Sequence, residues 1–290
     1  MENERKFPLI LSNFWLKVIA LLTMTIDHIG LLFMRGDTYT VFRSIGRLAL
    51  PLFCFMIAEG AIHTKSFKKY ALRLGIMASA ISIGMIGMEY IPVFGSMRDY
   101  GVIFIDLLLG ALAVYLLKQK KWYIKLLAIL PLAYGILSFI ASSLESCGCH
   151  GHILWLPFFM RTQYGWYGIL LIILFYVAHL LCNVFIKNLS GLSGVDANLY
   201  KDSNIERHAL NILSVMMLAV CSLLYYICTK MMPAKYVNWD IDMQLLAILS
   251  GVFILLYNGR RGYNKKWFQY GSYLYYPIHL IVIYVIFALI

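Results

Sequence analysis

Long apolar runs recur along the chain, and polar residues fall mainly between them. An α-helix needs about 20 apolar residues to cross the hydrocarbon core of a bilayer, so runs of that length predict membrane spans. Nine such spans are predicted, at 14–35, 42–62, 69–91, 100–117, 122–141, 166–188, 208–231, 242–258 and 267–290. The segment 153–160, "ILWLPFFM", is too short to cross and indicates an interfacial or re-entrant piece. The pattern predicts an all-α bundle of about nine transmembrane helices, within a range of about eight to ten.

Composition and charge support this architecture. Hydrophobic residues make up 61% of the 290 and charged residues only 13%, about half the charged share of a soluble domain. The net charge of +11 comes largely from Lys and Arg in the loops after the second, fourth, sixth and eighth spans. The positive-inside rule places these loops in the cytoplasm, with the amino terminus inside and the carboxy terminus outside. We find no nucleic-acid motif and expect a multi-pass protein of the inner (cytoplasmic) cell membrane, with the lipid bilayer as its partner.

One domain is predicted over residues 1–290. Residues 1–13 form a cytoplasmic amino-terminal segment in this arrangement, and the first apolar run is expected to stay as a helix because it lacks a cleavage site. Residues 142–165 form an outer loop and residues 189–206 a cytoplasmic loop.

Ionisable side chains inside predicted spans are costly in lipid, so each is a candidate functional residue. The first span, "LKVIALLTMTIDHIGLLF", carries Lys17, Asp27 and His28. Helix geometry returns Lys17 and His28 to nearly one face, about 16 Å apart along the axis. Asp27 and His28 are neighbours that point about 100° apart, so they cannot both face one point. We therefore expect Asp27 to serve a different contact from His28.

The second span returns antiparallel to the first, and a short turn between them sets which residues lie at equal depth. For two residues that face each other across the hairpin, the two residue numbers then add to about 75. This register predicts an Asp27–Arg47 pair in the outer half and brings Lys17 close to Glu59 at the cytoplasmic end, each pairing relieving the cost of a buried charge. His63 lies one turn beyond Glu59 and extends the polar face at the cytoplasmic mouth.

These charges admit three interpretations: an enzyme, a proton or substrate relay in a transporter or flippase, and ion pairs that only fasten helices. The sequence shows no inverted repeat and no pair of interrupted helices, the usual signs of a transporter. His28 has no obvious charge partner, and an imidazole with a pKa near 6.5 suits proton transfer. The enzyme interpretation is therefore favoured, with the transporter or flippase as its alternative.

Three segments carry a family resemblance. The opening span, "FRSIGRLALPLFCFMIAEGAIHTKSFKKYALRLG" and the carboxy-terminal "QLLAILSGVFILLYNGRRG" with "YLYYPIHLIVI" resemble the TraX family, whose named member is the acetylase of conjugative F pilin. The match runs in order across both ends of the chain. Between about residues 118 and 232 it is loose, with "YGWYGILLI" as its clearest piece.

A more distant similarity points to acyltransferase-3 proteins, which carry an Arg-x10-His pattern in their first span with an essential His. Lys17-x10-His28 has that spacing, and "LFCFMIAEG" and "KSFKKYALRLG" are similar to the segments that follow it there. Lys replaces Arg here, and Lys cannot form the bidentate fork that Arg makes to a phosphate or carboxylate.

The resemblance implies an integral-membrane acetyltransferase that takes acetyl-CoA from the cytoplasm. The acceptor would be an amine or hydroxyl of an envelope or extracytoplasmic molecule: a pilin-like peptide, a glycan or a lipid. The implied catalytic residues are His28 as general base, Asp27 and Arg47. Polyanionic CoA is expected at Lys17, Glu59, His63, Lys65, Lys69, Arg73, Asn258, Arg260 and Arg261. Substrate or oxyanion candidates are Asp106, Tyr276 and His279.

The segment "CGCHGH" in the predicted outer loop gathers Cys147, Cys149, His150 and His152. Two thiols and two imidazoles are zinc or copper ligands, but this crowded spacing is not that of a standard finger. A disulfide or free thiols are favoured, and no metal is expected. The sequence leaves open a homo-oligomer.

Overall fold

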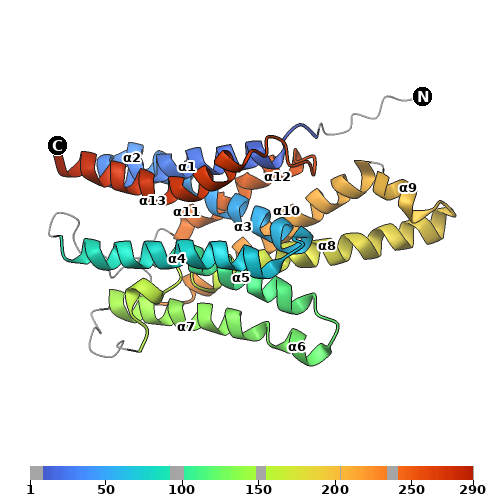
Figure 1. Cartoon of the computed structure of the whole chain (residues 1–290), viewed down its shortest axis with the longest axis horizontal. Helices are drawn as coiled ribbons and strands as arrows, with labels where there is room; N and C mark the ends of the chain where they lie inside the picture. The colour runs from blue at the N-terminus through green and yellow to red at the C-terminus, as the bar shows by residue number, and fades with distance from the viewer. Residues whose placement is uncertain (1–8, 92–100, 148–154, 203, 234–240, 290) are drawn as a thin grey trace.

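The structure is a computed structural model that describes residues 9–91, 101–147, 155–202, 204–233 and 241–289. Over these residues the regular structure is helical, apart from an isolated parallel bridge between Leu11 and Tyr257. The long helices lie along the long axis of the molecule (Figure 1). Seven helical stretches among the described residues are long and apolar enough to cross a bilayer.

Thirteen α-helices and two 3₁₀ segments are present among the described residues. They are α1 (Asn13–Phe33), α2 (Gly36–Gly46), α3 (Ala49–His63), α4 (Phe67–Glu89), α5 (Ile103–Leu117), α6 (Trp122–Leu126), α7 (Ile129–Ser146), η3 (Phe158–Met160), α8 (Trp166–Ser193), α9 (Ala197–Asp202), α10 (Asn204–Lys230), α11 (Ile241–Leu245), η5 (Leu246–Ser250), α12 (Gly251–Leu255) and α13 (Lys266–Leu289).

Each predicted span contains helix in its described part, but the helices differ in length. Two of them, 100–117 and 242–258, contain helices of only 10–17 residues, which are shorter than the seven long stretches. The segment 153–160 contains the 3₁₀ turn η3 in its described part. The predicted loop 189–206 is largely helical, because α8 continues to Ser193 and α9 and the start of α10 fill most of the remainder.

Two proline residues interrupt predicted spans. A proline ring clashes with the carbonyl four residues earlier and donates no hydrogen bond to it. Pro51 therefore separates α2 from α3 near Arg47, and Pro131 separates α6 from α7 near Leu127. Each interrupted pair still forms one stretch long enough to span, Gly36–His63 and Trp122–Glu145.

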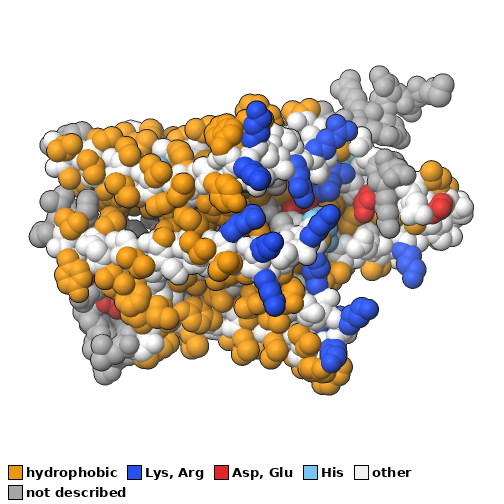
Figure 2. Space-filling view, viewed as in Figure 1, with side chains coloured by type: hydrophobic (Ala, Val, Ile, Leu, Met, Phe, Trp, Pro, Cys, Tyr) orange, Lys and Arg blue, Asp and Glu red, His pale blue; other side chains and the backbone are white. Residues whose placement is uncertain are grey.

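α1 and α13 pack side by side with their chains running in the same direction. Residue numbers increase together along the two helices in the contacting pairs, which are Phe14 with Phe268, Thr25 with Tyr275, His28 with His279, and Phe33 with Phe287. The two helices consequently begin at one end of the bundle and finish at the other (Figure 1). Lys and Arg side chains gather toward the end where α1 begins, while the other part of the visible face is mostly hydrophobic (Figure 2). The orientation of the termini relative to the cytoplasm stays a prediction from the positive-inside rule.

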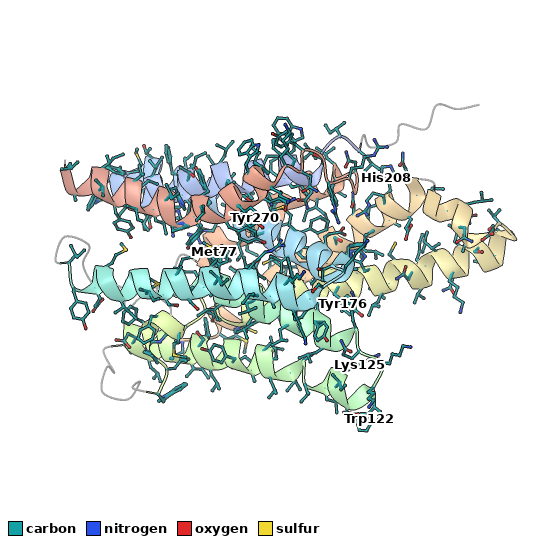
Figure 3. All side chains as sticks on the ribbon, in the orientation of Figure 1. Met77, Trp122, Lys125, Tyr176, His208 and Tyr270 are labelled. Carbon is teal, nitrogen blue, oxygen red and sulfur yellow. The ribbon has the colours of Figure 1, made fainter. Side chains whose placement is uncertain are left out.

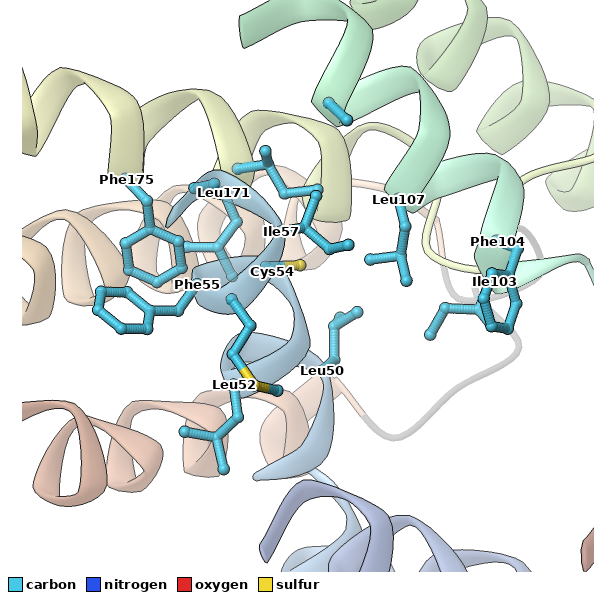
Figure 4. Packing of buried hydrophobic residues seen from close by; sticks show 14 of the residues in the cluster. Leu50, Leu52, Cys54, Phe55, Ile57, Ile103, Phe104, Leu107, Leu171 and Phe175 are labelled. Carbon is cyan, nitrogen blue, oxygen red and sulfur yellow. The ribbon is translucent and has the colours of Figure 1, made fainter. Parts of the chain in front are cut away.

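The core is built around α3, most of whose side chains are buried. Phe55 of α3 lies beside Leu171 and Phe175 of α8, while Leu52 points to the other side of α3 (Figure 4). The rings of Phe55 and Phe175 meet edge to face with their centroids 5.3 Å apart. An apolar α3 packed against α8 fixes the position of Glu59, which lies on its last turn.

Candidate functional site

A cavity of about 480 Å³ opens between helices from both ends of the chain. Its walls come from α1, α3, α4, α5 and α13, together with Arg207 at the start of α10 and the loop between α12 and α13. Figure 2 shows Lys and Arg side chains around an opening in which acidic and histidine side chains are visible. The cavity is therefore polar at the end where α1 begins.

Four cations line this cavity, namely Lys17, Arg73, Arg207 and Arg261. Lys17 comes from the first turns of α1, and its Nζ lies 5.7 Å from the centre of the Phe268 ring. Four positive side chains converging on one opening favour a polyanionic ligand, because charge-assisted hydrogen bonds to phosphate are strong.

Glu59 is the anion among these cations, and it is buried. His179 Nε2 lies 2.7 Å from Glu59 Oε1, Arg207 Nη1 lies 3.5 Å from the same oxygen, and His63 Nδ1 lies 3.8 Å from Oε2. Among the described residues no ion pair joins Lys17 to Glu59, whose partners are His63, His179 and Arg207. Both residues line the cavity, but Glu59 holds groups from α8 and α10.

The loop after α12 is tied to the segment that precedes α1. Leu11 N–H donates to the carbonyl of Leu256 at 2.9 Å, and Asn258 N–H donates to the carbonyl of Leu11 at 2.8 Å. Gly259 has a φ of +74°, and a Cβ there would lie 2.8 Å from the Arg207 guanidinium. Gly259 thus supplies both the left-handed backbone and the space that Arg207 occupies at the mouth.

The far end of the cavity is aromatic and aliphatic. Phe104 of α5 packs against Tyr276 of α13 with ring centroids 5.4 Å apart, and both line the cavity with Met24. A ligand that fills this cavity must be charged at one end and slender and largely apolar at the other.

His28 lies one helical turn beyond Met24 and is not among the lining residues. Its Nδ1 lies 2.9 Å from the Met24 carbonyl oxygen, which can only accept, so Nδ1 carries the proton and Nε2 the lone pair of the neutral ring. His279 Nδ1 donates in the same way to the Tyr275 carbonyl, and His279 Nε2 lies 3.1 Å from His28 Nδ1. The two histidines are therefore in direct contact across α1 and α13.

Asp27 points to α2, as expected, but the closest partner differs from the predicted one. Arg43 Nη1 lies 2.5 Å from Asp27 Oδ2, whereas Arg47 Nη2 lies 3.9 Å from Oδ1. Arg43 is one helical turn before Arg47, and a shift of four residues is within the error of placing an unseen turn. Asp27 also packs directly on Gly46, where any side chain would collide with it.

Some of the remaining predicted site residues line the cavity and others do not. Lys65, Lys69, Asn258 and Arg260 do not line the cavity, while Tyr276 does. Asp106 is buried, is not among the lining residues, and accepts hydrogen bonds from the backbone N–H groups of Gln163 and Tyr164, at 2.7 and 3.1 Å. These two hydrogen bonds connect α5 to the segment before α8. Of the metal candidates, Cys149, His150 and His152 lie outside the described residues.

Sequence comparison adds the family. The family described as TraX protein matches residues 12–287. The chain belongs to the TraX family. With seven helical stretches of spanning length among its described residues, this TraX protein is a multi-pass protein of the bacterial cell membrane.

Curated relatives match shorter stretches. "Probable fimbrial assembly protein FimC, serogroup H1" of Dichelobacter nodosus is 41% identical over 85 residues, which are 28% of this chain and 35% of FimC. "Uncharacterized protein RP591" of Rickettsia prowazekii (strain Madrid E) is 52% identical over 40 residues, 14% of this chain and 15% of that protein. The chain thus spans about a third or less of the length of these relatives. No solved structure matches it.

Several site residues of this TraX protein escaped the sequence analysis. Arg207 is not among the predicted site residues, yet it lines the cavity and faces the Tyr257 ring at 5.2 Å. His179 is likewise absent from the predicted set, yet it forms a hydrogen bond with Glu59. Their sequence separations from Glu59 exceed 100 residues, so no hairpin geometry connects them. The His28–His279 contact could have been suspected only from the presence of both residues in the resembling segments.

Proposed function

We propose that this TraX protein is a membrane acetyltransferase that moves an acetyl group from cytoplasmic acetyl-CoA to an amine or hydroxyl of an extracytoplasmic or envelope acceptor. The observation that carries the proposal is the cavity. Its cationic mouth and apolar inner end suit a donor with a polyanionic head and a slender arm. The inner end stops one helical turn short of the contacting histidines.

Acetyl-CoA fits this shape in one orientation. Its phosphates would meet Lys17, Arg73, Arg207 and Arg261, and its pantetheine arm would run along the aromatic lining toward Met24. Lys17 and His28 are about 16 Å apart along α1, a distance that an extended pantetheine arm can bridge. The thioester would then lie between the inner end of the cavity and His28.

The chemistry assigned to His28 is general base catalysis. His28 Nε2 takes a proton from the acceptor amine or hydroxyl as that group attacks the thioester carbonyl carbon. The tetrahedral intermediate collapses by breaking the C–S bond, and the CoA thiolate recovers the proton from His28. The hydrogen bond from Nδ1 to the Met24 carbonyl keeps the required tautomer. Tyr276, which lines the inner end, is the candidate donor to the oxyanion.

The acceptor is proposed to be an envelope component: a pilin-like peptide, a glycan or a lipid. The name of FimC describes fimbrial assembly in Dichelobacter nodosus, which favours a peptide of a surface fibre. The alternative function is a transporter or flippase that uses the same charges as a relay. Labelled acetyl-CoA separates the two, because an acetyltransferase releases free CoA even by slow hydrolysis, whereas a transporter leaves the thioester intact.

CoA binding is the first test. We expect CoA to raise the unfolding temperature of the purified protein in an uncharged detergent, and Arg261→Gln to weaken the apparent affinity about tenfold, because one charge-assisted phosphate contact is lost. Lys125→Gln is the matched control, since Lys125 is an exposed cation on α6 that does not line the cavity (Figure 3). Absence of any CoA effect on the unmodified protein would contradict the proposed function.

Gly259→Ala tests the shape of the mouth. The added methyl would crowd the Arg207 guanidinium at a backbone φ of +74°, so we expect CoA affinity to fall several-fold and stability to fall by about 1 kcal/mol. Gly36→Ala is the control, because Gly36 has a φ of +57° with nothing within 4 Å of the added carbon. The two variants should lose similar stability, and only Gly259→Ala should lose CoA affinity. Equal affinities in the two variants would show that Arg207 does not contact CoA.

A further inference from the structure

A second group of charges lies beyond His28, away from the mouth of the cavity. Arg43 lies in α2 and Arg47 directly follows it, and both face the single carboxylate of Asp27. The exposed side-chain fractions are 17% for Arg43, 12% for Arg47 and 14% for Asp27. One carboxylate cannot neutralise two guanidinium groups in such a setting, and an uncompensated buried charge is costly.

Arg47 is the less satisfied arginine. Its Nη2 lies 3.9 Å from Asp27 Oδ1, longer than a hydrogen bond, and its buried Nε has no hydrogen-bond partner. Asp106 does not compensate for it, because both Asp106 oxygens accept from the backbone N–H groups of Gln163 and Tyr164. Glu145, another buried acid, is paired with Arg161 at 3.1 Å. Arg47 thus has a positive charge and donor capacity that the described residues near it do not use fully.

The arginine pair also lies beside the proposed base. His28 follows Asp27 directly in the chain, and Asp27 is the carboxylate that both guanidinium groups face. The cavity lining reaches Met24 and stops there, so His28 stands between the donor cavity and the arginines. An acceptor bound at Arg43 and Arg47 would approach His28 from the side opposite to the donor.

We infer that Arg43 and Arg47 form an oxyanion-binding subsite for the acceptor, so that the acceptor carries a carboxylate or phosphate close to its reacting amine or hydroxyl. This inference rests on the proposed function for the identity of the bound molecule as acceptor. Asp27 orients Arg43 by a direct ion pair and leaves Arg47 as the main free donor. Two guanidinium groups suit an oxyanion better than lysines would, because each presents a planar fork of donors.

Anion binding by the purified full-length protein tests the subsite without knowledge of the acceptor. Inorganic phosphate and acetate are titrated separately in an uncharged detergent at constant ionic strength, and the rise in unfolding temperature gives an apparent affinity for each. Phosphate and acetate distinguish an acceptor phosphate from an acceptor carboxylate. We expect Arg47→Gln to weaken binding of the preferred anion at least tenfold and Arg47→Lys to weaken it less. Arg35→Gln, at an exposed arginine before α2, should leave it unchanged.

Arg261→Gln separates this subsite from the mouth. If anion stabilisation disappears in Arg261→Gln and persists fully in Arg47→Gln, the anion binds only at the mouth and the inference is overturned. If Arg47→Gln does not fold, equal anion affinities in Arg47→Lys and the unmodified protein overturn it instead. CoA stabilisation is measured on the same samples, so a protein that binds anions through Arg47 but does not bind CoA contradicts the proposed function and leaves the anion subsite standing.

Discussion

His28→Ala is expected to lower acetyl transfer, or the slow hydrolysis of acetyl-CoA in the absence of an acceptor, by about 10²–10⁴-fold. The reason is the position of the imidazole. Its Nδ1 is held by the Met24 carbonyl and its ring contacts His279, so the lone pair on Nε2 is the one available to take a proton. CoA binding should change little, because His28 does not line the cavity. The measurement is release of free CoA, with thermal stabilisation by CoA recorded in parallel.

The matched control is His208→Ala. His208 is a half-buried histidine of α10 outside the cavity lining, so its loss should leave both readouts near those of the unmodified protein (Figure 3). A rate unchanged by His28→Ala would refute general base catalysis by this residue. Loss of CoA binding together with activity would show instead that His28 shapes the cavity and that its effect on the rate is indirect.

Much of the fold follows from patterns that are local in the sequence. Apolar runs placed the helices because every backbone hydrogen bond must be satisfied inside a bilayer. The interruptions before Pro51 and Pro131 also follow from local rules. Helix geometry correctly turned Asp27 toward the second span, although Arg43 instead of Arg47 is its closest partner. Hydropathy does not fix where a helix begins or ends. The sequence therefore did not distinguish the short helices α5 and α12 from full-length spans, nor the largely helical segment 189–206 from a loop.

The site was only partly visible in the sequence for a related reason. The resemblance and the charge pattern predicted nine residues for CoA. Five of them line one cavity, namely Lys17, Glu59, His63, Arg73 and Arg261, whereas Lys65, Lys69, Asn258 and Arg260 do not. Arg207 and His179 reach Glu59 from α10 and α8, and that contact depends on how distant helices pack. His279 meets His28 because α13 lies parallel to α1, an arrangement that no short-range pattern encodes. Contacts within a hairpin could be predicted, whereas contacts between distant helices required the structure.

Asp27→Ala is expected to lower the free energy of unfolding by about 3 kcal/mol, because it leaves the largely buried Arg43 and Arg47 without their carboxylate. Unfolding by sodium dodecyl sulfate in mixed micelles measures the change. Asp37→Ala is the control, since Asp37 is an exposed acid in the first turn of the neighbouring α2 and its loss should cost less than about 0.5 kcal/mol. Adding Arg43→Ala to Asp27→Ala should restore part of the loss by removing one unpaired charge.

The same variant links stability to the proposed acceptor subsite. With Asp27 removed, both guanidinium groups become available to an added anion, so phosphate or acetate should stabilise Asp27→Ala more than it stabilises the unmodified protein. Asp27 competes with the anion for Arg43 in the unmodified protein, which is why the affinity should rise and not merely persist. An Asp27→Ala protein that is destabilised but gains nothing from anions would show that the three charges fasten α1 to α2 and bind no acceptor. One that is as stable as the unmodified protein would show that the ion pair does not hold the hairpin together.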